Sequence, residues 1–219
     1  MLHLLIELGK QIDNNTLFFG NFVDADLKFA DLHDYLDDID KFMTRKKRYK
    51  EKKLGGGVVQ DIAFDMFSES FSSILFDSVL ISVWVFMEAE FKGYCGAMQR
   101  AMAVTLNYSD LRGSAIERFR NYTSKVLKLD LRSRDENWED LKAINEIRNS
   151  LVHTDGIAGN KKLINNFIKR HKLTGLLCED KILVDKNILK IIITLCRLFI
   201  ERIYYVALEK FPGQYGSKS

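Results

Sequence analysis

Proline is almost absent from this chain. Its 219 residues include one proline, Pro212, which follows the last long apolar stretch. Proline removes a backbone N–H donor and collides with the preceding helical turn, so the interiors of long helices exclude it. Apolar residues make up 47% of the sequence, which is ordinary for a globular chain that is large enough to bury a core. The sequence therefore predicts an all-α protein.

Cysteine and histidine are also scarce. The chain has three cysteines, Cys95, Cys178 and Cys196. An odd number without close spacing is neither a disulfide framework nor a zinc-binding pattern, and it is typical of a reducing cytoplasm. His3 and His33 have no metal-ligand spacing, and we expect His171 to lie at the surface. We therefore expect a cytoplasmic protein that needs no metal and no cofactor.

Uninterrupted hydrophobic runs are missing as well. The N-terminus has no basic segment, and Glu7 interrupts its short apolar run, so it does not resemble a signal peptide. Residues 71–91 and 188–208 are long enough to span a membrane, but both contain charged residues, such as Asp77 in the first and Arg197 in the second. Charges at the centre of a bilayer are costly. We expect both stretches to be helices of a bundle, and no membrane partner.

Positive charge is concentrated in one short run. The net charge of +3 is too small to indicate nucleic-acid binding by itself. Residues 45–53 are strongly basic, and the run begins with Arg45, Lys46, Lys47 and Arg48. Such a run can attract RNA phosphates, although it is more often the solvated end of a helix. We keep both interpretations.

Helical periodicity accounts for most of the chain. It predicts helices over about 22–53, 58–107, 111–129, 137–155, 161–170 and 186–210. The second of these is either one very long helix or two helices with a break near 68–73. Residues 176–184 change to a strand-like pattern around a Glu-Asp-Lys turn, which predicts a small β-hairpin insert near 173–185.

Glycine-rich and polar segments suggest how the chain is divided. Gly55 to Gly57 would form a joint between an N-terminal helical extension, residues 1–57, and an up-down helical bundle, residues 58–210. Residues 211–219 would be a flexible tail. Within the bundle, Asn137 is expected to cap the helix that follows it, and Gly156 to end that helix.

The helix over 137–155 has two contrasting faces. Ile144, Ile147 and Leu151 follow at i, i+3 and i+7, an apolar stripe that should face the core. The second stripe, which the core does not need, consists of Asn145, Asn149 and His153 at i, i+4 and i+8, with Arg148 beside it. A face with an arginine, two amides and a histidine is suited to contact water, a partner chain or a phosphate.

This pattern resembles the HEPN superfamily. Its signature is an arginine, usually with a polar neighbour, followed after four to six residues by a histidine, and Arg148-Asn-Ser-Leu-Val-His153 fits the four-residue form. Trp138 lies at the entry of the same helix, and residues 82–91 resemble the helix with tryptophan and glutamate that often packs beside the motif. The similarity covers residues 75–208 as architecture, but only residues 148, 149 and 153 as specific identities.

Membership of that family would imply a metal-independent RNA endonuclease that acts as a homodimer, with both motif helices facing one cleft. In the chemistry that this implies, the RNA 2′-hydroxyl attacks the adjacent phosphate and leaves a 2′,3′-cyclic phosphate end. His153 would transfer protons, Arg148 would hold the phosphate, and Asn149 would orient the imidazole or donate to a phosphate oxygen. Asn145, Asp155 and Glu88 are candidate supporting residues. A toxin or an antiviral defence effector, restrained by an antitoxin or a regulatory partner, is the expected setting.

Two other interpretations remain open. Arg148 can pair with Glu146 or Asp155 while His153 simply caps the helix end, in which case the motif is only structural. A HEPN-like module can also bind RNA or a protein without cutting. One departure from the family concerns control: some HEPN toxins carry a tyrosine, which a partner enzyme modifies, two residues after the histidine, and here that residue is Asp155.

Overall fold

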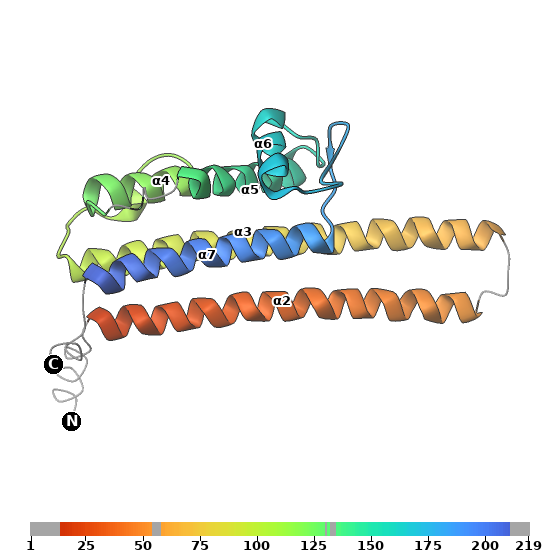
Figure 1. Cartoon of the computed structure of the whole chain (residues 1–219), viewed down its shortest axis with the longest axis horizontal. Coiled ribbons are helices and arrows are strands. Elements are labelled where there is room, and N and C mark those ends of the chain that lie inside the picture. The colour runs from red at the N-terminus through yellow and green to blue at the C-terminus, as the bar shows by residue number, and fades with distance from the viewer. Residues whose placement is uncertain (1–13, 54–57, 130, 132–134, 211–219) are drawn as a thin grey trace, which may run out of the picture. The chain divides into compact units, whose positions relative to one another are not determined.

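The computed structural model describes residues 14–53, 58–129, 131 and 135–210. The elements, in order, are α2 (Asn14–Lys53), α3 (Val58–Ala101), η1 (Tyr108–Asp110), α4 (Ala115–Asn121), η2 (Tyr122–Val126), α5 (Asp135–His153), α6 (Lys161–His171), β1 (Leu177–Cys178), β2 (Lys181–Ile182) and α7 (Lys186–Lys210) (Figure 1). The described chain is therefore almost entirely helical, as the sequence predicts. The expected joint at Gly55 to Gly57 and the tail 211–219 lie outside the described residues.

Several expected boundaries were wrong. α3 is one helix without a break at 68–73, which is the first of the two predicted alternatives, but it ends at Ala101 rather than near residue 107. α2 begins at Asn14 rather than near residue 22. α4 begins at Ala115, not at residue 111, because the Ser114 hydroxyl accepts the N–H of Glu117 and caps the helix there. Asn137 is the third residue of α5 and so does not cap it.

The chain forms two compact units. The first comprises residues 1–28, 87–135 and 196–219, and the second residues 29–86 and 136–195. α2, α3 and α7 each contribute residues to both units. Each unit also combines residues from before and after position 57, and the expected division of the chain at that position stays a prediction.

Aromatic side chains form the core of the first unit. Phe91 of α3 stacks on Phe119 of α4 with ring centroids 4.4 Å apart, and Phe199 of α7 meets Phe91 edge-on at 5.9 Å. Tyr94 and Tyr204 make a further edge-on contact at 5.5 Å. Such pairs add to the energy of apolar burial. The short helix α4 is thereby fixed to α3 and α7.

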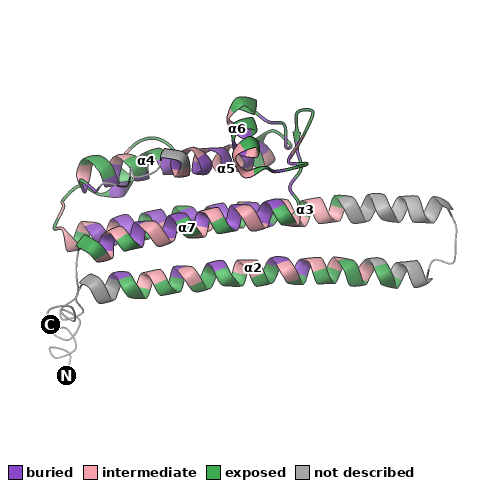
Figure 2. Cartoon of the chain, in the orientation of Figure 1, coloured by how far each residue is buried: buried purple, intermediate pink, exposed green. Residues whose placement is uncertain are grey.

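Aliphatic side chains dominate the core of the second unit. Ile144 of α5, Ile164 of α6 and Ile192 of α7 are fully buried, as are Trp84 of α3 and Leu36 of α2. Figure 2 shows this burial as stripes along the helices, with exposed residues on their opposite sides. This packing fixes α5, the helix with the HEPN-like motif, by its apolar stripe.

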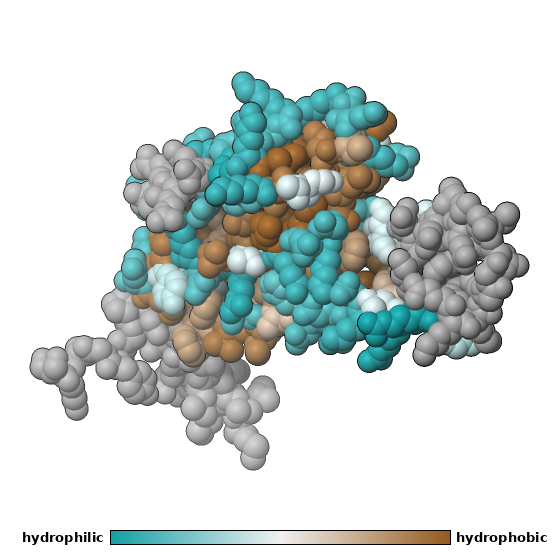
Figure 3. All heavy atoms as spheres, turned by 45° about the vertical axis from the view of Figure 1, so that its right-hand side comes forward, coloured by the Kyte–Doolittle hydropathy of each residue, from teal (hydrophilic) through white to brown (hydrophobic). Residues whose placement is uncertain are grey.

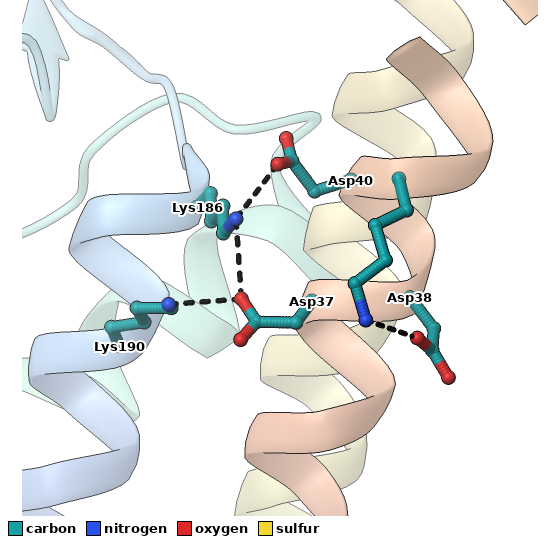
Figure 4. Close-up of polar contacts among 6 residues, drawn as sticks. Asp37, Asp38, Asp40, Lys186 and Lys190 are labelled. Carbon is teal, nitrogen blue, oxygen red and sulfur yellow. Dashed lines mark hydrogen bonds and ion pairs between the residues drawn. The ribbon is translucent and has the colours of Figure 1, made fainter. Parts of the chain in front are cut away.

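Ion pairs connect α2 and α7 within the second unit. Lys186 Nζ lies 2.7 Å from an Asp40 oxygen and 3.1 Å from Asp37 Oδ1, and Lys190 Nζ lies 2.9 Å from the same Asp37 oxygen (Figure 4). The nearby ammonium groups of Lys190 and Lys186 lower the pKa of Asp37 to about 2. These groups are partly exposed, so they specify how α2 and α7 pair more than they stabilise the fold.

One segment of α3 has the length and composition of a membrane span. It covers Ser70–Ala101, and 28% of its most apolar 18-residue window is buried. The core helices of soluble proteins pass the same test, so this is weak evidence, and no other described helix passes it. Figure 3 shows hydrophobic side chains together on one face of the molecule, bordered by hydrophilic ones. The expected absence of a membrane partner stays a prediction.

Candidate functional site

α5 presents the two faces that its sequence predicts. Ile144 and Ile147 of the apolar stripe are fully buried and Leu151 is half-buried, while Asn145 and Asn149 are half-buried and His153 is exposed. The polar stripe is therefore partly open to solvent along α5, and it becomes more exposed toward the C-terminal end of the helix.

Arg148 forms no ion pair with any described residue. One of its terminal nitrogens donates a hydrogen bond to Asn149 Oδ1 at 2.9 Å, and its Nε is buried without a hydrogen-bond partner among the described residues. Glu146, a candidate partner, instead accepts the backbone N–H of Asn160 at 2.8 Å. The pairing of Arg148 with Glu146 or Asp155, which the structural interpretation of the motif requires, is absent from the described part of the chain.

A left-handed turn ends α5 immediately after His153. The Ser150 carbonyl accepts the N–H groups of Thr154, at 3.1 Å, and of Gly156, at 2.9 Å. Asp155 and Gly156 have φ angles of +52° and +81°. This is the C-terminal arrangement that favours glycine. The prediction that Gly156 ends the helix is confirmed.

The β-hairpin holds this helix end in place. β1 and β2 are antiparallel, with Leu177 opposite Ile182, which confirms the predicted hairpin. The N–H of Ile182 donates to the Gly156 carbonyl at 2.8 Å, and the N–H of Ala158 donates to the Asp180 carbonyl at 2.9 Å. The hairpin is therefore connected directly to the turn that follows His153.

The candidate supporting residues are only partly brought together. Asn145 and Asn149 share the α5 face with His153, but Asp155 makes no hydrogen bond or ion pair with His153 in the described structure. Asp155 therefore does not support His153 through a carboxylate–imidazole contact. Glu88 is exposed on α3 in the first unit, so its support of Arg148 stays a prediction.

The basic run lies at the C-terminal end of α2. Arg45 and Arg48 are exposed, and the ammonium of Lys46 lies 4.9 Å from the centre of the Phe71 ring. The side chain of Lys47 lies outside the described residues. A solvated helix end and an RNA contact are both compatible with this arrangement.

A buried polar cluster near the start of α5 was not predicted from the sequence. An Asp140 carboxylate oxygen accepts a hydrogen bond from Arg170 at 2.6 Å, and its second oxygen lies 3.0 Å from Nε2 of His171. The expectation that His171 lies at the surface was wrong, because its side chain is only 19% exposed and packs on the Phe167 ring at 4.8 Å. This cluster connects the C-terminal end of α6 to α5.

Comparison with known proteins adds no relative. No protein-family model matches the sequence, and neither the curated proteins nor the solved structures contain a match. Among the described residues, no group of three or more histidine, cysteine, aspartate or glutamate side chains is placed to hold a metal ion. The HEPN resemblance therefore depends on the motif and its helical setting.

Proposed function

We propose that this protein is a HEPN-like, metal-independent RNA endonuclease that acts as a homodimer. The observation that carries the proposal is the Arg148 guanidinium, which is half-buried on the polar face of α5 and has no carboxylate partner among the described residues. Charged side chains that are partly buried are usually paired. A phosphate would supply the missing negative charge and accept two parallel hydrogen bonds.

The residues of this face suit cleavage at a phosphodiester. His153 of one protomer would take the proton from the RNA 2′-hydroxyl, whose oxygen then attacks the adjacent phosphorus. As the bond from phosphorus to the 5′-oxygen breaks, the partner's His153 would give a proton to that oxygen. Arg148 would stabilise the negative charge that develops on the phosphorane. The products would be a 2′,3′-cyclic phosphate and a 5′-hydroxyl.

Exposed apolar side chains beside the motif support the dimer. Val152, next to His153, is 43% exposed, and Ile157 and Leu183, on the turn and the hairpin that follow, are 57% and 43% exposed. Apolar groups gathered beside a polar site are typical of an interaction surface. A second copy that covers them would bring the two histidines toward one cleft.

The alternative function is a non-catalytic module that binds RNA or a protein through the same face. One observation favours it: His153 has no hydrogen-bond partner among the described residues that would orient its imidazole. Catalytic histidines usually have such a partner. If the protein is instead an enzyme, bound RNA or the partner protomer would have to orient the His153 imidazole. The proposal of a nuclease includes a role as a toxin or as an antiviral defence effector, which rests on the family resemblance.

The test compares matched variants on the same RNA. Asn149→Ala removes an amide from the motif face, while Asn165→Ala removes an exposed amide from α6 and serves as the control. We expect Asn149→Ala and His153→Ala to lose cleavage and Asn165→Ala to retain it, with all three variants folded and dimeric by circular dichroism and light scattering. Equal cleavage by the His153→Ala variant would reject the enzyme. Retained RNA binding without cleavage by the wild type would favour the module.

A further inference from the structure

A pocket of about 510 Å³ lies in the first unit, and none of its lining residues belongs to the motif. Its floor is a stripe of α3, and its opposite wall is the η1 turn, which contributes Asn107, Tyr108 and Ser109. Pockets for small organic ligands fall in this size range. A lone inorganic anion would fill only a small part of it.

Two glycines form the floor without an evident packing reason. Gly93 and Gly96 are separated by one helical turn, and glycine weakens a helix relative to alanine. A Cβ at Gly93 would meet no heavy atom within 4 Å, so no neighbouring side chain requires a glycine there. What the missing side chain preserves is the open volume of the pocket.

A cation lies close to Gly96. A guanidinium nitrogen of Arg100 lies 3.6 Å from the position that a Cβ at Gly96 would take. The Arg100 side chain therefore folds back along α3 over the pocket floor. Lys92 stands one turn before Gly96 on the same stripe, so its ammonium and the guanidinium can reach the same ligand group.

The lining is positively charged and rich in neutral polar groups. It contains Lys92 and Arg100, which form no ion pair with a described residue, and none of the described lining residues is acidic. Asp110, next to the lining, already accepts the backbone N–H of Asn107 at 3.1 Å. Asn107 and Gln99 contribute side-chain amides to the lining, and Ser109 contributes a hydroxyl. Such groups both donate and accept hydrogen bonds, as the recognition of a sugar or a base requires.

We propose that this pocket binds a nucleoside phosphate, with the phosphate between Lys92 and Arg100 over the Gly93–Gly96 floor. The phosphate supplies the negative charge that no described residue gives to Lys92 and Arg100. The nucleoside fills the remaining volume beside the η1 turn. A free mononucleotide and the phosphorylated end of an RNA present the same chemistry. The inference does not depend on the proposed nuclease, because none of its residues belongs to the motif.

Isothermal titration calorimetry on the full chain tests it with AMP, ADP and adenosine as probes. We expect one AMP or ADP per chain and no binding of adenosine. Gly93→Leu fills the floor and should weaken binding about tenfold or more, while Gly20→Leu should not, because Gly20 is another helical glycine whose Cβ would meet nothing within 4 Å. Both changes should raise the melting temperature, so lost binding cannot be ascribed to unfolding.

Charge variants and short RNAs complete the test. Arg100→Gln should weaken AMP binding about tenfold, because a charge-assisted hydrogen bond is lost. Lys125→Gln, which removes an exposed lysine of the same unit outside the pocket, should not change binding. Binding of a 5′-phosphorylated trinucleotide, but not of its 5′-hydroxyl form, would identify an RNA end as the source. Absence of binding of all phosphorylated probes to the folded wild type, or equal binding by Gly93→Leu, would overturn the proposal.

Discussion

Replacement of Gly156 by alanine tests how the end of α5 is built. Gly156 has a φ of +81°, a region that costs a residue with a Cβ about 1–2 kcal/mol. The added Cβ would lie 3.6 Å from the Ile182 carbonyl oxygen and 3.8 Å from Leu151 Cδ2, which are ordinary contacts. The destabilisation should therefore come from the backbone alone. In a chain of this size it should lower the melting temperature by about 2–8 °C.

Gly175 provides a matched control for this change. It also has a φ of +81°, but a Cβ there would meet no heavy atom within 4 Å. Thermal unfolding followed by circular dichroism should therefore show similar losses for Gly156→Ala and Gly175→Ala. A loss of more than about 3 kcal/mol for Gly156→Ala alone would show that the hairpin packs against this turn more tightly than its contacts indicate. If neither variant loses thermal stability, the argument that a Cβ is costly at this φ angle is refuted.

Three further predictions concern charged groups. Asp140→Asn should lower the free energy of unfolding, measured by urea denaturation, by about 2 kcal/mol. This is less than the loss of a fully buried pair, because Arg170 remains partly solvated. Unchanged stability would show that the Asp140 cluster does not stabilise the fold. The pKa of Asp37, about 2 in the folded chain and near 3.9 unfolded, means that its stabilisation is present above pH 4 and lost as the pH falls toward 2. Denaturation curves from pH 5 to 2 should show this loss of stability in the wild type and less of it in Asp37→Asn. The same pH dependence in both would show that Asp37 makes no such contribution. Arg148→Lys keeps the positive charge but cannot donate two parallel hydrogen bonds to a phosphate, so RNA cleavage should fall about tenfold without loss of stability. Full activity of this variant would argue against a phosphate bound at Arg148.

Local sequence signals predicted the elements that depend on local chemistry. The bounds of α7 were predicted closely, because its apolar periodicity starts after Asp185, whose side chain accepts the N–H of Ile188, and continues to Lys210. The hairpin and the glycine that ends α5 were predicted from turn chemistry in the same way. α4 was placed incorrectly because its true start depends on the Ser114 cap, which the apolar pattern does not reveal.

The contacts that complete the sites depend on tertiary structure. The approach of Arg170 and His171 to Asp140 joins residues about thirty positions apart, and their sequence spacing gives no signal for it. Glu146 likewise accepts the N–H of Asn160, fourteen positions further along the chain, a contact that its sequence position does not indicate. The glycines on α3 were visible in the sequence at helical spacing, but they define a pocket only once the η1 turn lies opposite them.

The most direct measurement of the proposed function is RNA cleavage in EDTA by the purified wild type and by His153→Ala, with analysis of the product ends. We expect the wild type to leave 2′,3′-cyclic phosphate and 5′-hydroxyl ends, and the variant, equally folded and dimeric, to leave the RNA intact. Cleavage that EDTA abolishes, or that survives loss of the imidazole, would contradict a metal-independent nuclease centred on His153.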